Sequence, residues 1–172
     1  MGLLGGLFKK AKHKGYFEIE ISSISRLTNN AVKVAFDIPE KLSEKFNYAP
    51  GQYINILAEI GGKEERRSYS ICSAKDEKLA IGIKSVKNGI VSNWFNLEAQ
   101  EGTKLFISEP QGNFKIPSGA KHVATIAAGS GITPILSILK SKSNVEGMHL
   151  LYGNRSKEET MFLEEIKQMN NI

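Results

Sequence analysis

The stretch Arg66-Arg67-Ser68-Tyr69-Ser70-Ile71-Cys72-Ser73 decides how the rest of the chain can be organised. Its side chains alternate as in a β-strand, yet it carries two arginines, a tyrosine and three serines. An arginine fork suits a phosphate, a tyrosine face suits a planar ring, and a serine hydroxyl can reach a ring heteroatom. The segment is either a strand that presents these groups to a bound molecule or an exposed strand of an antiparallel sheet.

The composition is that of an ordinary soluble protein: 172 residues, 41% hydrophobic and 24% charged. The net charge of +5 comes from scattered lysines, which fit a basic cleft for anionic ligands, and no nucleic-acid partner is expected. The single cysteine, Cys72, excludes a disulfide framework and an iron–sulfur cluster held by this chain, and no metal site is expected. No apolar run reaches about 18 residues, so no transmembrane helix is predicted. We expect a cytoplasmic protein.

Residues 1–15 combine a few apolar side chains with four lysines. We expect a solvated basic tail without membrane contact, the alternative being a short helix on a membrane surface.

Residues 16–116 show the period-two alternation of β-strands, with a turn signal roughly every ten residues. This spacing predicts a six-stranded antiparallel barrel of the Greek-key type, and a short helix over Ser92–Leu97 that caps one end. The apolar strand segments are Phe17–Ile21, Val32–Phe36, Gln52–Glu59, the Arg67 strand, Leu79–Val86 and Leu105–Glu109.

Residues 117–172 have the pattern of an α/β lobe. The continuous apolar run His122–Ala128 predicts a buried parallel strand, and helical spacing follows over Ile132–Lys140. A second strand is predicted over Met148–Tyr152 and a charged helix over Ser156–Met169. A doubly wound sheet usually has about five or six strands, so this lobe is expected to be the incomplete, amino-terminal part of one.

Asn88-Gly89-Ile90-Val91-Ser92 precedes the short helix of the barrel. Backbone N–H groups at a helix start, with Gly89 allowing close approach and Ser92 as cap, form an anion site, although a simple turn with a cap would look the same. Together with Arg67, this start offers two phosphate clamps with a tyrosine between them. That combination suits a dinucleotide with a planar head, and FAD is the natural choice.

Ala127-Ala128-Gly129-Ser130-Gly131-Ile132-Thr133-Pro134 lies between a predicted strand and a helix, where a glycine turn can cradle a pyrophosphate. Pro134 takes the place of the third glycine of the dinucleotide fingerprint, and some turns of this kind bind nothing. Tyr152-Gly153-Asn154-Arg155-Ser156 follows the next strand, where Arg155 could meet a 2′-phosphate. The alternative for it is a polar loop with a helix cap at Ser156.

These motifs resemble the ferredoxin–NADP reductase superfamily. Arg67-x-Tyr69-Ser70, Gly89-x-x-Ser92, Pro110-Gln111-Gly112-x-Phe114 and Ala128–Pro134 occur in that family in this order and at these separations. Within the family, the chain looks most like reductases of the phenylacetyl-CoA epoxidase type and flavodoxin reductase-like flavoproteins, from about Phe17 onward.

The resemblance implies a role for each matching residue. Arg67 and the Gly89–Ser92 turn would hold the FAD pyrophosphate, Tyr69 would stack on the isoalloxazine, and Ser70 would bond near flavin N5. The turn Gly129–Pro134 would receive the nicotinamide nucleotide, with Thr133 near the nicotinamide, and Arg155 matches a position associated with NADPH. We therefore expect Ser70, Tyr69 and Thr133 as catalytic residues. The expected cofactor-binding residues are Arg67, Ser68, Tyr69, Ser70, Ile83, Lys84, Gly89, Ile90, Val91, Ser92, Gly129, Gly131, Ile132, Thr133, Pro134 and Arg155.

The implied function is hydride transfer from NADPH or NADH to FAD, followed by electron transfer to a fused iron–sulfur domain or a small carrier protein, feeding an oxygenase component. Family members continue through further strands, so this chain is expected to be part of a longer reductase. Two alternatives stay open: a non-catalytic FAD-binding module, and a barrel without cofactor that serves as an interaction domain.

The remaining notable side chains are expected to be structural. His122 and His149 are predicted to lie in the core or at a sheet edge, and Cys72 to be a small buried hydrophobe. Core positions are also predicted for Trp94, Phe95 and Phe114. A solvated helix face is predicted for Lys157, Glu158, Glu159, Glu164, Glu165 and Lys167.

Overall fold

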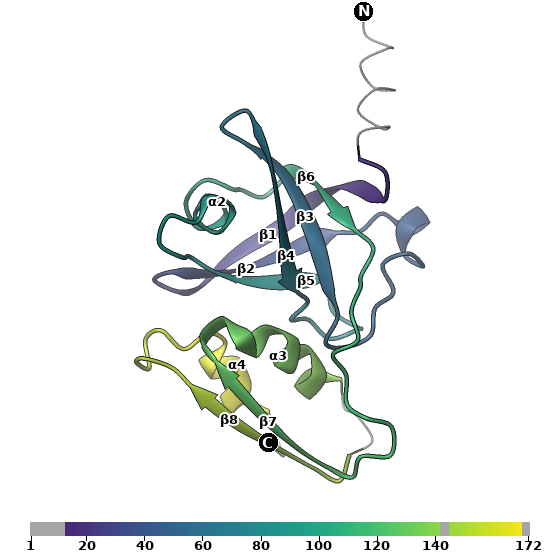
Figure 1. Ribbon diagram of the computed structural model, residues 1–172, viewed down its shortest axis with the longest axis vertical. Coiled ribbons are helices and arrows are strands. Elements are labelled where there is room, and N and C mark those ends of the chain that lie inside the picture. The colour runs from purple at the N-terminus through teal and green to yellow at the C-terminus, as the bar shows by residue number, and fades with distance from the viewer. Residues whose placement is uncertain (1–12, 142–144, 170–172) are drawn as a thin grey trace, which may run out of the picture.

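The computed structural model describes residues 13–141 and 145–169, which form a barrel-like sheet and a smaller α/β lobe (Figure 1). The sheet has six antiparallel strands in the order β4-β3-β6-β1-β2-β5. Because β6 lies between β3 and β1, the order is that of a Greek key, and the predicted six-stranded barrel is confirmed. The strands are β1 (Tyr16–Thr28), β2 (Ala31–Asp37), β3 (Tyr53–Ile60), β4 (Lys63–Ser70), β5 (Ala80–Lys84) and β6 (Lys104–Ser108).

The barrel core is built by alternation along five of these strands, since successive side chains of a strand point to opposite faces. The inward side chains are nearly all aliphatic, with exposed fractions of 3% or less. They are Ile19, Ile21, Val32, Val34, Phe36, Ile54, Ile56, Ile81, Ile83, Leu105 and Ile107. Strand β4 differs, because none of its side chains is fully buried. Its polar residues are therefore available to something other than the core.

The two outer strands of the sheet meet just beyond Ser70. There Ile71 and Ile81 form an isolated antiparallel bridge, and the Cys72 N–H donates to the Ala80 carbonyl at 2.9 Å. Helix α2 (Ile90–Leu97) covers one end of the barrel with its buried Val91 and Phe95 side chains. The predicted capping helix is thus confirmed, although it begins two residues earlier than the sequence suggested. A 3₁₀ turn, η1 (Glu40–Leu42), interrupts the connection from β2 to β3.

The α/β lobe consists of two parallel strands and the segments that follow them. Strand β7 (His122–Ala128) leads through the 3₁₀ turn η2 (Gly129–Gly131) into helix α3 (Ile132–Lys140), and β8 (Gly147–Gly153) pairs with β7. The parallel pairing and α3 agree with the sequence prediction.

The predicted helix over Ser156–Met169 is wrong in its first half. Only α4 (Leu163–Lys167) is helical, and residue Phe162 before it has a left-handed backbone with φ of 60°. Met161 and Phe162 are 0% and 4% exposed, and the turn that brings both side chains into the core is incompatible with one continuous helix. Tertiary burial has overridden the local preference of a charged, helix-forming sequence.

Helix α3 lies between the barrel and the β7–β8 sheet (Figure 1). A single cluster of buried side chains crosses this boundary: Cys72 and Ala80 of the barrel belong to the same cluster as Ile132, Leu136 and Phe162 of the lobe. A shared apolar core of this kind holds two units in one relative orientation.

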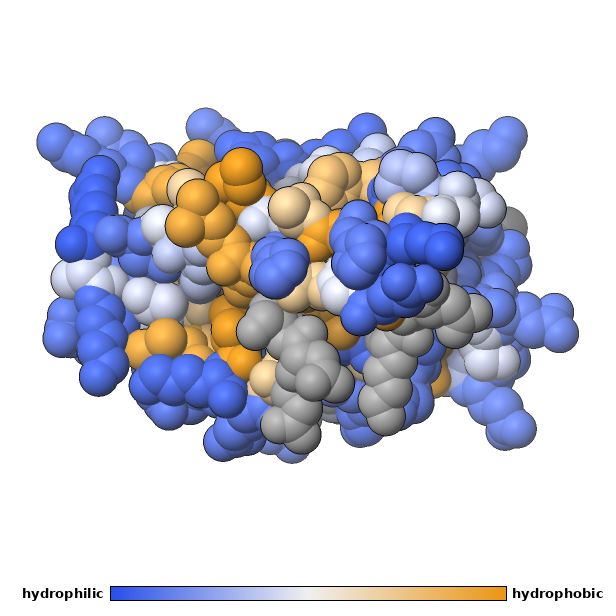
Figure 2. Space-filling model, turned by 90° about the horizontal axis from the view of Figure 1, so that it is seen from below, coloured by the Kyte–Doolittle hydropathy of each residue, from blue (hydrophilic) through white to orange (hydrophobic). Residues whose placement is uncertain are grey.

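The other face of the β7–β8 sheet is open among the described residues. Ile126 and Leu151 are 77% and 67% exposed there, and apolar side chains gather on this face in Figure 2. His122 and His149 are exposed on the two edge strands of this described sheet, which is one of the two positions predicted for them. The prediction of a buried strand is wrong. The reason is that α3 covers only one side, whereas a continuous apolar strand is the pattern of a parallel sheet covered on both.

Candidate functional site

A cavity of about 410 Å³ lies where strands β4 and β5, the start of α2 and the start of α3 converge. Most of the residues singled out from the sequence line it. These are Arg67, Ser68, Tyr69, Ser70, Lys84, Gly89, Ile90, Val91, Ser92, Gly131, Thr133 and Pro134. The fold therefore joins segments that are more than sixty positions apart in the sequence. Four expected residues, Ile83, Gly129, Ile132 and Arg155, do not line the cavity.

Arg67 reaches the cavity from β4 with its side chain half exposed. Its Nη1 lies 3.2 Å from Glu65 Oε2 and donates to the Arg66 carbonyl at 2.6 Å. Arg67 is half exposed and Glu65 partly buried, and an ion pair with this much access to solvent contributes on the order of 1 kcal/mol to stability. The guanidinium can therefore exchange Glu65 for a phosphate at little cost.

Tyr69 supplies a partly buried ring to the cavity wall. The ring packs edge-on against Phe95, with the centroids 6.1 Å apart, and burial raises the pKa of the phenol to about 12. The hydroxyl is thus neutral at physiological pH, and the ring is held by the helix that caps the barrel. Its neighbour Ser68 donates its hydroxyl to Asn55 Oδ1 at 2.6 Å, while Ser70 ends the strand in the cavity wall.

The start of α2 lacks a side-chain cap. Its N-cap is Gly89, and the Ser92 hydroxyl accepts from the Val86 N–H at 3.4 Å instead of capping the helix, so the predicted capping role of Ser92 is wrong. A Cβ on Gly89 would lie 2.4 Å from both Ser92 Oγ and Val86 Cγ2, which leaves no room for a side chain in this turn. The first N–H groups of the helix therefore carry partial positive charge without an internal acceptor, which suits an anion.

Strand β5 contributes one buried and one charged side chain. Ile83 is 1% exposed and belongs to the barrel core, so its side chain cannot contact a ligand. Lys84 lines the cavity, and its Nζ lies 2.9 Å from Glu159 Oε2 of the α/β lobe. That hydrogen bond and the charge of Lys84 lower the pKa of Glu159. The sequence predicted a solvated position for Glu159, and the structure adds a direct contact with Lys84 of the barrel.

The glycine turn after β7 approaches the cavity from the other lobe. Gly129 has φ of +50°, and a Cβ on Gly129 or on Gly131 would meet nothing within 4 Å, so both backbones face open space. The Tyr152 hydroxyl donates to the Gly129 carbonyl at 2.8 Å, and Thr133 Oγ1 donates to the Ser130 carbonyl at 3.0 Å. These bonds fix the turn, and the open backbone of Gly131 lets a ligand come close.

Besides Gly129 in the turn, two expected residues of this lobe do not line the cavity. Ile132 is 0% exposed in the core that joins the lobes, and Arg155 is an exposed loop residue after β8. The role predicted for Arg155 remains a prediction. The expectation that Phe114 belongs to the core is wrong, since its side chain is 57% exposed, whereas Phe95 is buried as predicted.

Gly82 is a residue of the site that the sequence analysis missed. A Cβ at this position on β5 would lie 2.8 Å from Thr133 Cγ2 and 2.9 Å from the Phe162 ring. Only glycine lets the start of α3 sit this close to the barrel. A lone glycine inside an otherwise apolar strand is a recognised sign of such close approach, and that signal was present in Ala80–Lys84.

The donors in the cavity fit an anionic dinucleotide. The cavity is surrounded by two cations, an uncapped helix start, a partly buried aromatic ring and an open glycine turn. In the part of the chain that the structure describes, no three His, Cys, Asp or Glu side chains are grouped so as to hold a metal ion. None of the helices in those ranges is both long and apolar enough to cross a bilayer.

Family models agree with this arrangement. Residues 18–116 match the oxidoreductase FAD-binding domain, and residues 125–172 match the oxidoreductase NAD-binding domain. The chain therefore belongs to the FAD- and NAD-binding oxidoreductases of the ferredoxin reductase type, as the motifs suggested.

Curated relatives are similar in sequence but longer. The chain is 32% identical over 154 residues to a subunit of the 1,2-phenylacetyl-CoA epoxidase of Escherichia coli (strain K12), covering 86% of this chain and 43% of that protein. It is also 32% identical over 164 residues to the ferredoxin reductase component of 3-ketosteroid-9-alpha-monooxygenase of Mycobacterium tuberculosis (strain CDC 1551 / Oshkosh), covering 88% and 46%. The chain thus spans less than half the length of these relatives.

Solved structures share the fold. A ferredoxin NADP+ reductase from Neisseria gonorrhoeae, with bound FAD and NADP, matches with a TM-score of 0.78 at 22% identity, over 89% of this chain and 63% of that one. Phthalate dioxygenase reductase matches with a TM-score of 0.75 at 24% identity, over 91% and 49%. The barrel with its attached α/β lobe is therefore the ferredoxin reductase fold.

Proposed function

We propose that this chain is the flavin-binding barrel and the adjoining nucleotide lobe of an NAD(P)H-dependent reductase. One observation carries the proposal: a single cavity gathers Arg67, Tyr69, the uncapped start of α2 and the Gly131–Pro134 turn. The cavity thus offers groups for a phosphate, a planar ring and a second nucleotide. This combination fits hydride transfer between two bound dinucleotides better than the binding of one dinucleotide alone.

In this proposal the barrel residues bind and orient FAD, which when bound accepts a hydride and passes on single electrons. Arg67 and the N–H groups of Ile90–Ser92 neutralise the pyrophosphate. Lys84 adds a second cation at the cavity. The neutral Tyr69 ring covers the isoalloxazine, and the Ser70 hydroxyl is available for a ring nitrogen. No acid–base pair is required, because the work of these residues is binding, orientation and exclusion of water.

The lobe residues receive the hydride donor. The open backbones of Gly129 and Gly131 admit a pyrophosphate, and Thr133 and Pro134 form the wall that the nicotinamide meets. We assign NADPH rather than NADH on Arg155 alone, whose guanidinium suits a 2′-phosphate.

Electrons would pass from the flavin to an iron–sulfur centre, in a fused domain or in a separate protein, or to a small carrier protein that serves an oxygenase. The names of the relatives support this partner class, because one belongs to an epoxidase and another is the ferredoxin reductase component of a monooxygenase. A single, fully buried cysteine agrees with a reducing cytoplasm as the location.

A second function, a non-catalytic FAD-binding module, is favoured by one observation. The described part of the lobe has two strands, and Ile126 and Leu151 on its open face are largely exposed. Such a lobe gives a nicotinamide less enclosure than the barrel gives a flavin. Reduction of bound FAD by NADPH separates the two functions.

Replacing Arg67 tests the cofactor assignment. Charge-assisted hydrogen bonds contribute about 1.5–3 kcal/mol, so Arg67→Ala should weaken FAD binding by roughly ten- to a hundredfold in a fluorescence titration. Arg66→Ala is the matched control, because Arg66 lies on the same strand, is exposed and stacks on Tyr16 away from the cavity. Equal FAD affinity in both variants would remove Arg67 from the site.

A further inference from the structure

Helix α3 carries a stripe of polar side chains on the face that meets the barrel. Thr133, Ser137 and Lys140 are spaced i, i+4 and i+7, which places them on one side of a helix. Thr133 and Ser137 are buried, with exposed fractions of 5% and 0%, and Lys140 is partly buried, with 7% of its side chain exposed. Buried polar groups on an otherwise apolar helix need hydrogen-bond partners. The Thr133 hydroxyl finds one in its own turn, the Ser130 carbonyl, whereas Ser137 and Lys140 find theirs on the barrel side.

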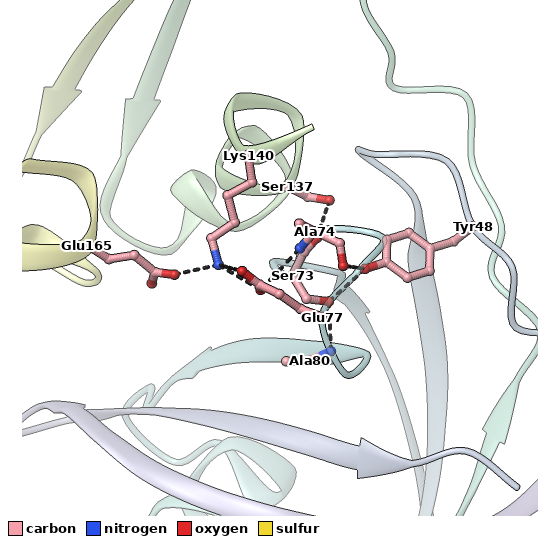
Figure 3. A network of polar contacts seen from close by, with 8 residues as sticks. All are labelled: Tyr48, Ser73, Ala74, Glu77, Ala80, Ser137, Lys140 and Glu165. Atoms are coloured by element: carbon pink, nitrogen blue, oxygen red, sulfur yellow. Dashed lines mark hydrogen bonds and ion pairs between the residues drawn. The ribbon is translucent and has the colours of Figure 1, made fainter. Parts of the chain in front are cut away.

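The stripe meets the barrel at three successive points, one by packing and two by hydrogen bonds. The Thr133 methyl lies against the bare backbone of Gly82, and the Ser137 hydroxyl donates to the Ser73 carbonyl at 2.7 Å. Lys140 Nζ donates to both carboxylate oxygens of Glu77, at 2.9 and 3.1 Å, and also pairs with Glu165 of α4 (Figure 3).

The barrel side of this contact is hydrogen-bonded within itself. Tyr48 gives its one hydroxyl proton to the Ala74 carbonyl at 2.6 Å, so at the 2.8 Å contact the Ser73 hydroxyl is the donor. Ser73 Oγ also accepts the Ala80 N–H at 3.0 Å, and burial raises the pKa of Tyr48, which keeps the network neutral. Figure 3 shows these groups converging under Ser137. Ser73 lies three residues after Ser70, so this hydrogen-bonded network is close in the chain to the cavity wall.

Lys140 is held by carboxylates from both sides of the contact. Burial alone would lower the pKa of Lys140, but its hydrogen bonds to Glu165 and Glu77 outweigh burial and raise that pKa. Lys140 therefore stays charged at physiological pH. The Glu77 and Glu165 side chains are 41% and 34% exposed, so removing Lys140 leaves two partly solvated carboxylates of like charge side by side.

We propose that the stripe Thr133–Ser137–Lys140 is a positioning device that sets how closely the Gly131–Pro134 turn faces the flavin wall. Its two anchored segments, α3 and residues 70–73, are the ones that carry Thr133 and Ser70 into the cavity. The proposal rests on the proposed function, since the distance it fixes matters for hydride transfer. Misplacement by about 1 Å can cost about a hundredfold in such a step.

Lys140→Met in the FAD-loaded full chain tests this role. The limiting rate at which NADPH reduces the bound flavin should fall about tenfold, while the affinities for FAD and NADPH stay within about threefold, and Lys140→Arg should recover much of the rate. Lys167→Met is the matched control, because Lys167 makes an exposed ion pair with Glu164 on α4. It should leave all three quantities unchanged.

Ser137→Ala keeps the test open if Lys140→Met does not fold, because it removes one hydrogen bond and no charge. Normal reduction rates in the folded variants would overturn the positioning role and leave the proposed function intact. A fall in NADPH affinity with an unchanged limiting rate would also overturn it, since that is the result of a binding role. Wild-type chain that binds FAD and is not reduced would instead contradict the proposed hydride transfer, and the positioning role with it.

Discussion

The barrel and the α/β lobe bury their apolar surfaces in different ways. The barrel closes on itself through the Ile71–Ile81 bridge and has a core of its own. The lobe has one covered face, and most of its buried side chains share a cluster with Cys72 and Ala80 of the barrel. The contrast teaches that the barrel is the self-sufficient part of the site, whereas the lobe depends on α3 and its contacts with the barrel for its position.

The largest expected effect compares two isoleucines, one in each region. Ile56 is 0% exposed in the barrel and Ile126 is 77% exposed on the lobe. Ile56→Ala should lower the free energy of unfolding by about 2–5 kcal/mol, whereas Ile126→Ala should change it by less than about 0.5 kcal/mol. Urea denaturation followed by far-ultraviolet circular dichroism measures both. Similar losses of unfolding free energy in the two variants would contradict the difference between a closed barrel core and an open lobe face.

A second, smaller effect concerns the contact between the regions. Gly82→Ala places a methyl group against Thr133 and Phe162, and such overpacking should cost about 1–3 kcal/mol and push the lobe outward. Gly131→Ala is the matched change, because a Cβ there meets nothing within 4 Å and φ is not left-handed. Amide exchange should rise in α3 for the Gly82 variant only. Unchanged amide exchange in that variant would mean that the position of the lobe does not depend on the close contact at Gly82.

The smallest effect uses the buried thiol where the regions meet. Burial raises the pKa of Cys72 to about 12 from 9.0, so between these values the unfolded chain loses the thiol proton while the folded chain keeps it. The folded state then binds more protons, and stability must fall as pH rises above 9. The slope is at most about 1.4 kcal/mol per pH unit for one group. Cys72→Ala should flatten the loss measured by urea denaturation between about pH 9 and pH 11. An identical slope would show that the thiol is already accessible to water.

The barrel was predictable from sequence because its signals are local. Alternation from Phe17 to Ile107 and the regular turn signals predicted strands that the structure confirms. The residues of the cavity were predictable because their chemistry is unusual for strands and turns. Arginine, tyrosine and serine on one polar strand have few structural explanations.

The contacts between the regions were not predictable in this way. Lys140 and Glu77 are 63 positions apart, and nothing in either neighbourhood marks them as partners. A helix was predicted after Ser156 because the charged residues of that segment favour one. The burial of Met161 and Phe162 interrupts this helix, and burial is a tertiary effect that the local sequence does not show. The exposure of β7 was not predicted because a continuous apolar strand does not reveal that one of its faces is open.

The absorption spectrum of the purified chain with FAD, followed by anaerobic addition of NADPH, tests the central claim most directly. The account predicts a bound-flavin spectrum that bleaches when NADPH is added, because one cavity serves both nucleotides. A chain that leaves FAD free in solution would contradict the account, since Arg67, Tyr69 and the start of α2 would then have no ligand to hold.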